Sequence, residues 1–560
     1  MADVAKAAGA PAPSLFRPRG RKRAPRGLLV GAGLCALLVL MPLAFTIYRA
    51  LTFGWDDAVE LVFRPLVGEL LVNTLEITVG ATLVSAIIGT ATAWFIERSR
   101  LPGRRLWAAL TVAPLAMPAF ITSYAWVSLS QDLQDYTGAL LVISTAYFPL
   151  VYLPVAAALR GMDPALEESA RSLGCGRFSV FMRVVLPQLR PALLGGMLLV
   201  ALGTLSEFGA FTLLRFRTFT TQIYAEFRTS FDSSGASVFA CILIAMCLVC
   251  LALEMRVRGA ARYERVDRGT RRAALRYELG PWKWLVVAAF AVLSMVTLGV
   301  PIGMIGFWLT QSGAAAITPA EVSPELLLES TLSSLGYGVV AAIVTTLACV
   351  PLAFLLVRFP SRTATSFERI VFLAQGLPSL VVALAIVSIA VHALRPLYQS
   401  AALLVVAYAI LFLPLALASV RAAFTQAQPR LEETARSLGL SWQATAWRVL
   451  LPLAGPGLGA GATMVFISVV TELNSTLLLS PIGTRTLATQ VWIDTSTLAF
   501  AAAAPYAALL VGISLAASGA LFALLGRSAV ESRVDSAVAP SMKSTDIELQ
   551  AGTPSESTTL

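Results

Sequence analysis

The sequence is poor in the residues from which catalytic and metal sites are most often built. His392 is the only histidine among 560 residues, which excludes a histidine-based metal site and leaves one residue for any Ser-His-Asp or Cys-His catalytic set. The six cysteines fall mostly in apolar stretches, and Cys247 and Cys250 form a CxxC pair without a second pair to complete a metal site. We therefore expect neither catalytic residues nor a metal site, and we expect no cofactor.

Lysine is scarce, and its four positions exclude a phosphate-binding loop. Such a loop needs Gly directly before the lysine and Ser or Thr directly after it. The lysines at positions 6, 22, 283 and 543 do not meet both conditions. The chain cannot hydrolyse nucleotide by that mechanism, so active transport would need an ion gradient or a separate ATPase.

Charge is also scarce, because charged residues make up 13% of the chain and hydrophobic residues 57%. A helix needs about 20 apolar residues to cross the hydrocarbon core of a bilayer. Twelve stretches qualify, six in each half: 28–50, 71–96, 107–130, 139–160, 192–214 and 236–256, then 282–309, 330–357, 367–394, 400–424, 456–480 and 500–526. We predict an all-α polytopic membrane protein with about 12 transmembrane helices in two homologous six-helix halves.

Arginine-rich loops orient these spans. Arginines gather before the first span and in every second loop, and such loops remain in the cytoplasm. This pattern places both termini in the cytoplasm and accounts for the net charge of +10 without a nucleic-acid partner. The predicted organisation is a basic N-terminal segment (1–27), a first half (28–256), a cytoplasmic linker (257–281), a second half (282–526) and a disordered tail (527–560).

A nine-residue segment occurs twice. Residues 166–174 read LEESARSLG and residues 431–439 read LEETARSLG. Each copy is predicted to form a short cytoplasmic helix, which Asp163 and Pro164 begin in the first copy and a glycine ends in both. Within it, Glu167 can pair with the arginine four residues later on an exposed face, as can Glu432 with Arg436. Two such helices with exposed apolar residues favour docking to two equivalent sites on a symmetric partner.

Both copies resemble the permease subunits of binding-protein-dependent ABC importers. That family carries EAA, three residues, Gly, nine residues, then Ile-x-Leu-Pro. Here the pattern reads Glu168-Ser169-Ala170, Gly174 and VVLP at 184–187, then Glu433-Thr434-Ala435, Gly439 and VLLP at 449–452. The resemblance implies coupling helices that contact ATPase subunits through Glu167, Glu168, Ala170, Leu173, Gly174, Glu432, Glu433, Ala435, Leu438 and Gly439.

The same resemblance implies partners and a location. We expect two copies of a cytoplasmic ABC ATPase subunit and an extracytoplasmic substrate-binding protein. The chain itself would lie in the lipid bilayer of the cell (inner) membrane. ATP-driven closure of the ATPase pair would then rock the two halves.

The double-length arrangement is most similar to ferric-iron permeases, with segments 205–224 and 471–492 as the supporting residues. Glu207 and Glu472 occupy equivalent positions in apolar spans, where a carboxylate marks a candidate pathway. Ser206 and Asn474 are possible polar neighbours, and the alternative is that each glutamate bonds a neighbouring helix. Other readings are a permease for thiamine, phosphonate or polyamine, an ion-coupled secondary transporter, or a membrane-embedded enzyme.

Overall fold

The computed structural model describes residues 24–229, 233–258, 276–311, 323–427, 429–521 and 523. These residues are mostly helical with short connecting loops, and they contain one isolated β-bridge, between Ser99 and Tyr277. The prediction of an all-helical protein is confirmed. The predicted cytoplasmic positions of the termini, most of the linker at 257–281 and the tail at 527–560 lie outside the described residues.

The first half runs through thirteen α-helices with short 3-10 or π turns between them. They are α1 (Arg26–Thr52), α2 (Trp55–Val62), α3 (Pro65–Arg98), α4 (Arg104–Val112), η1 (Ala113–Ala116), α5 (Ala119–Leu129), η2 (Gln131–Leu133), α6 (Tyr136–Tyr147), α7 (Pro149–Gly161), α8 (Pro164–Ser172), α9 (Arg177–Val180), η3 (Phe181–Val185), α10 (Leu186–Ser206), α11 (Gly209–Leu213), α12 (Phe219–Thr229) and α13 (Ser233–Arg258).

The second half repeats much of this order. It contains η4 (Gly280–Trp282), α14 (Lys283–Ser294), η5 (Met295–Gly299), α15 (Val300–Thr310), α16 (Pro324–Arg358), α17 (Arg362–Leu373), η6 (Ala374–Gly376), α18 (Ser379–Ala393), η7 (Arg395–Leu397), α19 (Ala401–Gln426), α20 (Pro429–Ser437), α21 (Trp442–Thr445), η8 (Ala446–Leu450), α22 (Leu451–Val470), α23 (Asn474–Leu479), α24 (Leu487–Ser496) and a final helix, Phe500–Leu521.

The described residues contain 10 helices long and apolar enough to cross a membrane, or up to 12 if two bent pairs each count as one span. Large apolar side chains are exposed along one face of α3 at the three- or four-residue spacing of a helix, as at Val72, Leu75, Val79, Leu83 and Ile87. Such a face suits contact with lipid, so the predicted polytopic membrane protein is confirmed.

The two bent pairs fall where single spans were predicted at 107–130 and 367–394. The chain turns by 93° between residues 104–116 and 119–129, and by 105° between residues 362–376 and 379–393. Proline disfavours helical geometry in the residue before it. Met117 before Pro118 and Leu377 before Pro378 are accordingly extended, with ψ of 114° and 124°, so both spans are broken at the same place.

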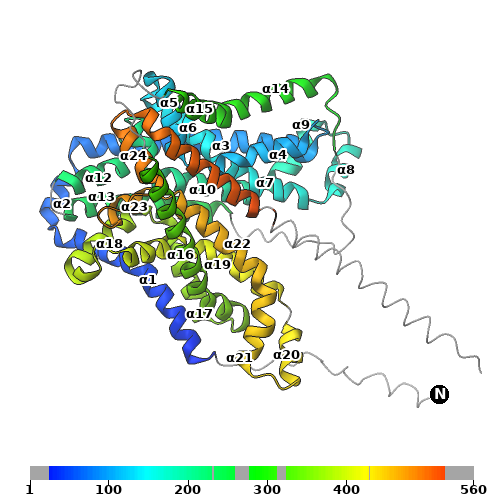
Figure 1. The fold of residues 1–560 in the computed structure, drawn as a ribbon. Helices are drawn as coiled ribbons and strands as arrows, with labels where there is room; N and C mark the ends of the chain where they lie inside the picture. The colour runs from blue at the N-terminus through cyan, green and yellow to red at the C-terminus, as the bar shows by residue number, and fades with distance from the viewer. Residues whose placement is uncertain are drawn as a thin grey trace, which may run out of the picture.

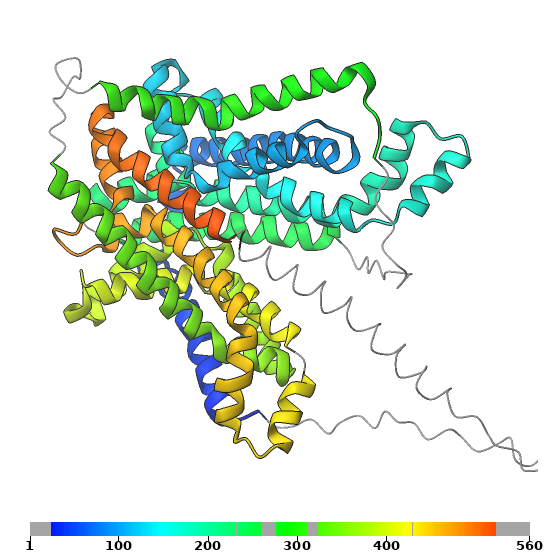
Figure 2. The same ribbon diagram turned by 45° about the vertical axis from the view of Figure 1, so that its right-hand side comes forward.

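The first helix of each half packs on the other half. Helix α1 lies against α16, α17 and α18, where the Cys35 thiol donates to the Ala348 carbonyl at 3.0 Å. Helices α14 and α15 cross the first half, where Trp107 and Phe290 have ring centroids 5.7 Å apart. Both views show these green helices beside the blue and cyan ones (Figures 1 and 2). The halves are therefore interlocked rather than merely adjacent.

The rest of each half forms an arm, and the arms diverge (Figure 1). Helices α3, α7 and α10 pack together in the first arm, and α16, α19 and α22 in the second. Helices α8 and α9 lie at the tip of the first arm, and α20 and α21 at the tip of the second. The duplicated sequence thus occupies two separate ends of the molecule.

Candidate functional site

Helices α8 and α20 are the two copies of the repeated segment. The Asp163 carboxylate accepts the Ala165 N–H at 2.9 Å, and Pro164 takes the first helical position, as predicted. Gly174 and Gly439 follow the helices with φ of +81° and +87°, a backbone conformation that glycine adopts readily. The predicted beginning of the first helix and the glycine exits of both are confirmed.

Both helices present apolar side chains to the outside. Leu173 is 83% exposed and Leu438 is 78% exposed, while Leu166 and Leu431 are also exposed. Ala170 is half-buried and Ala435 is buried, so the alanines of the stripe face the protein. Sequence reasoning missed Phe178 and Trp447, which are exposed just beyond the two helices and enlarge the apolar surface at each tip.

Glu167 and Glu432 do not lie on an exposed face. The Glu167 carboxylate meets the Arg98 guanidinium of α3 at 2.7 Å, with both side chains fully buried. In the second arm Glu432 pairs in the same way with Arg358 of α16, whose Nη2 also donates to the Ala427 carbonyl at 2.8 Å. The prediction that these glutamates lie on an exposed face is therefore wrong. Helix α8 is instead fixed to α3, and helix α20 to α16, the long membrane helix of its own arm.

Burial and charge act in opposite directions on Glu167. Burial raises the pKa of the Glu167 carboxyl, and the Arg98 guanidinium opposes that shift. Glu168 and Glu433, the acids of the repeated EAA-type pattern, are exposed at the tips. Each of the helices α8 and α20 therefore has one glutamate directed inward and one directed outward.

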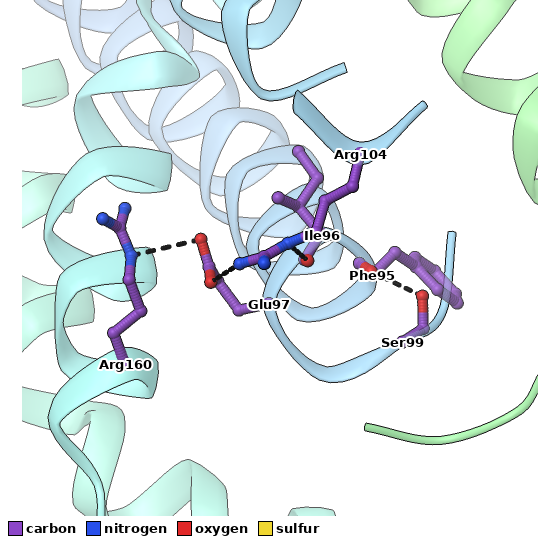
Figure 3. Close-up of polar contacts among 6 residues, drawn as sticks. All are labelled: Phe95, Ile96, Glu97, Ser99, Arg104 and Arg160. Atoms are coloured by element: carbon purple, nitrogen blue, oxygen red, sulfur yellow. Dashed lines mark hydrogen bonds and ion pairs between the residues drawn. The ribbon is translucent and has the colours of Figure 1, made fainter. Parts of the chain in front are cut away.

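A second ionic cluster secures the end of α3. Figure 3 shows Glu97 between Arg104 of α4 and Arg160 of α7. The Arg160 Nε lies 3.1 Å from the Glu97 carboxylate, and Arg104 also donates to the Ile96 carbonyl. In the second arm Arg421 pairs with Glu368 across α19 and α17. Charged side chains of neighbouring helices thus hold the end of each arm together.

A π-helical turn lies between each arm tip and the long helix that follows it. Turn η3 precedes α10, and turn η8 precedes α22. The Leu186 N–H bonds to the Phe181 carbonyl, five residues back. Pro187 follows without an N–H to bond the Arg183 carbonyl, and Pro452 has the same position in the second arm. The Leu-Pro part of the repeated pattern therefore coincides with a local change of helix geometry.

Glu207 and Glu472 lie at breaks between helices rather than inside continuous spans. Helix α10 ends at Ser206 and α22 at Val470, which corrects the predicted spans at 192–214 and 456–480. The Glu207 carboxylate accepts the Ala210 N–H at 2.9 Å and the Tyr147 hydroxyl at 2.6 Å. The Glu472 carboxylate accepts the Ser475 N–H at 3.2 Å. Each acid thus stabilises the start of the short helix that follows it.

The two breaks meet across the halves. The Glu207 and Glu472 carboxyls are near enough to interact electrostatically, and both are only partly buried. A Cβ added at Gly209 would come within 2.8 Å of the Leu473 Cδ2 atom. The rings of Phe208 and Trp492 also make contact, with centroids 5.3 Å apart. The repeat equivalence of the two glutamates is therefore matched by proximity in space.

The predicted polar neighbours differ in their contacts. The Asn474 side chain donates to the Ser379 hydroxyl at 2.8 Å, which links α23 to α18. Ser206 is partly exposed at the end of α10. Within the described ranges, His, Cys, Asp and Glu form no group of three that could hold a metal ion.

Comparison with known proteins gives the family. The profile described as "Binding-protein-dependent transport system inner membrane component" matches residues 58–258 and 349–534. The chain is 34% identical, over 86% of its length and 94% of the relative's, to the Fe(3+)-transport system permease protein FbpB 2 of Haemophilus influenzae. A putative ferric transport system permease of the same organism is 22% identical over 82% of this chain and 79% of its own.

A shorter relative matches along most of its own length but along less than half of this chain. The sulfate transport system permease protein CysT of Escherichia coli is 29% identical over 38% of this chain but 85% of its own length. One part of the chain therefore corresponds to most of a shorter permease, which agrees with the duplicated arms. The chain belongs to the family of binding-protein-dependent transport system inner membrane components, and it is a multi-pass inner-membrane permease of an ABC transporter.

Proposed function

We propose that the chain forms the ferric-iron pathway of an ATP-driven importer. Two copies of a cytoplasmic ATPase subunit would dock on α8 and α20, and an extracytoplasmic binding protein would deliver the substrate. The observation that carries this proposal is the pair of matching arm tips. Each bears a glutamate–arginine pair, fully buried in the first arm and largely buried in the second, beneath exposed leucines.

The geometry of the tips supports a mechanical role for both helices. Leu173 and Leu438 present apolar surface that a partner can bury. The pairs Arg98–Glu167 and Arg358–Glu432 tie α8 to α3 and α20 to α16, so movement of either helix would be transmitted to its arm. Since the arms diverge toward their tips, closing two ATPase subunits together would bring the arms together.

Ferric iron is the cargo that the comparisons and the charges favour together. A relative that covers most of both chains is named for Fe(3+) transport. Two carboxylates at the junction of the halves suit a cation better than an oxyanion such as the sulfate named for the shorter relative. Carboxylate oxygens are hard ligands, and the limited number of them suits passage rather than storage.

The test is uptake by the complete transporter in proteoliposomes, containing the chain, its ATPase and its binding protein. Ferric iron is expected to enter only when ATP is present on the ATPase side, whereas sulfate and thiamine are excluded. Glu207→Gln and Glu472→Gln should each lower iron uptake by about tenfold, equivalent to about 1.4 kcal/mol.

Matched controls are available in both arms. Glu69 and Glu329 are exposed acids near the starts of α3 and α16, and their glutamine variants should transport normally. Uptake of iron by the chain alone, driven by an ion gradient, would contradict the proposal. So would normal iron uptake by the Glu207→Gln, Glu472→Gln double variant.

A further inference from the structure

The first coupling helix has a contact that reaches it from outside its own arm. Residues 276–279, here called the strap, lead from the linker between the halves into η4 and α14. The Tyr277 N–H donates to the Arg98 carbonyl at 2.8 Å, and the Arg100 N–H donates to the Tyr277 carbonyl at 3.0 Å. These two bonds form the isolated bridge and fix the strap to the chain that follows α3.

Side chains of the strap extend this attachment to α8. The Tyr277 hydroxyl donates to the buried Glu167 carboxylate at 2.9 Å. Its ring lies 4.3 Å below the Arg171 guanidinium and stacks on Trp94, with centroids 6.0 Å apart. Tyr277 therefore touches both an inward acid and a cation of the same coupling helix, as well as the membrane helix to which α8 is fixed.

The flanking residues of the strap hold Tyr277 in place. Glu278 pairs with Arg100 at 2.6 Å, and Leu279 packs on the apolar cluster of the first arm that includes Leu159 and Val180. Because α14 follows directly, the strap ties the start of the second half to the tip of the first arm. The attachment thus combines main-chain bonds, an ion pair and apolar burial.

The second arm is built differently at the matching position. Arg98 corresponds to Arg358, since both end a long helix and pair with a coupling-helix glutamate. Two residues later, the first arm has Arg100 and the second has Pro360. Proline has no N–H, so Pro360 cannot make the bond with which Arg100 holds the strap. The second arm is therefore unable to accept a strap in this way.

The aromatic packing around Trp94 in the first arm also differs from that around the matching residue in the second arm. In the second arm Phe354, which corresponds to Trp94, packs on Phe359 and Phe424, with ring centroids at 6.2 Å and 5.7 Å. The aromatic partners of Phe354 thus come from the second arm itself and not from the linker between the halves. Arg171 is half-buried against the Tyr277 ring, whereas Arg436 is exposed.

We infer that Tyr277 is a positioning residue that makes the two ATPase-docking sites unequal. The strap fixes the orientation of α8 against α3, whereas Pro360 prevents the second arm from bonding a strap in the same way. This inference rests on the proposed coupling role of α8 and α20. It adds that the link between the halves acts on the first docking site through a contact that the second arm cannot make in the same way.

A pair of matched distances tests the inference without any partner. In a background from which the six native cysteines have been removed, spin labels are placed at Arg105→Cys and Ser172→Cys in the first arm. The equivalent labels in the second arm are at Ser366→Cys and Ser437→Cys. All four sites are exposed, on α4, α8, α17 and α20.

Tyr277→Ala is expected to broaden and shift the 105–172 distance distribution while the 366–437 distribution stays unchanged. Tyr277→Phe keeps the ring contacts and removes only the bond to Glu167, so a smaller broadening is expected. An unchanged 105–172 distribution in the alanine variant would overturn the inference. Equal broadening in both arms would do so as well, because it would indicate general loosening.

Transport provides the second readout. In the reconstituted complex, Tyr277→Ala should lower the iron taken up per ATP hydrolysed several-fold, and Tyr277→Phe should recover part of that ratio. Tyr398→Phe, at an exposed tyrosine distant in sequence, serves as the control. An unchanged ratio in the alanine variant would overturn the unequal-site inference. The distance measurement needs no ATPase, so failure of the coupling proposal itself would be recognised separately.

Discussion

The Arg98 guanidinium and the Glu167 carboxylate meet at 2.7 Å in a fully buried position. Removing one partner leaves the other charge buried and uncompensated, which typically costs more than the pair contributes when intact. Glu167→Gln should therefore lower the free energy of unfolding by about 3 kcal/mol, as measured by denaturation in mixed micelles. Glu168→Gln, on the exposed side of the same helix, should leave it almost unchanged.

The double variant Arg98→Leu, Glu167→Leu separates the cost of an unpaired charge from the value of the pair. Apolar replacements of both partners often restore stability. We expect the double variant to recover most of the loss. If it were as unstable as Glu167→Gln, the buried charge would not be the cause.

The outward acids Glu168 and Glu433 are expected to act on the ATPase rather than on stability. Replacing both with alanine should uncouple ATP hydrolysis from iron uptake, because each arm tip would lose its outward-facing carboxylate. The measurement is uptake and hydrolysis in the same proteoliposomes. Ser169→Ala with Thr434→Ala restores the alanine of the family pattern and is the matched control. Normal coupling in the glutamate double variant would refute the assignment of α8 and α20 as coupling helices.

Gly174 and Gly176 form a natural comparison at the end of α8. A Cβ at either position would meet nothing within 4 Å, but only Gly174 has a positive φ, of +81°. Gly174→Ala should therefore cost about 1 kcal/mol of unfolding free energy, since an L-residue is disfavoured in that conformation. Gly176→Ala should cost less. A reversed order in chemical denaturation would show that the glycine exit of α8 is not required.

Gly209 lies where the two halves touch. A Cβ there would come within 2.8 Å of the Leu473 Cδ2 atom and 2.9 Å of the Phe120 Cβ atom. Gly209→Ala should lower the free energy of unfolding by about 2 kcal/mol through overpacking and should also reduce iron uptake. Adding Leu473→Ala should restore part of both losses. Gly303→Ala is the control, because a Cβ at that position would meet nothing within 4 Å.

Local features of the sequence predicted the local structure well. The cap at Asp163, the glycine exits at 174 and 439, and most of the apolar spans follow from residue type and spacing, and the structure confirms them. The bends at Pro118 and Pro378 had a signal in the sequence, since proline constrains the residue before it. A count of apolar residues alone did not reveal them.

The contacts of Glu167 could not be derived from spacing. An exposed pair with Arg171 fitted the helical period, yet Arg98 arrives from a helix distant in sequence, and Tyr277 from the linker between the halves. The burial of Glu167 depends on how distant helices pack against each other. Helical spacing within one segment does not specify that packing. The roles of Glu207 and Glu472 in passage remain predictions, although their proximity across the halves supports them.

The π-helical turns η3 and η8 have a consequence for how force would travel along each arm. A helix that contains one wide turn can change its hydrogen-bond register there by a residue, which rotates everything beyond the turn by about 100°. Movement of α8 would therefore be converted at η3 into rotation of α10 about its own axis, as well as displacement. Glu207 lies at the other end of α10. In the proposed function, such a register change at η3 would turn the Glu207 end of α10 relative to Glu472, with a shift of about 1.5 Å along the helix axis.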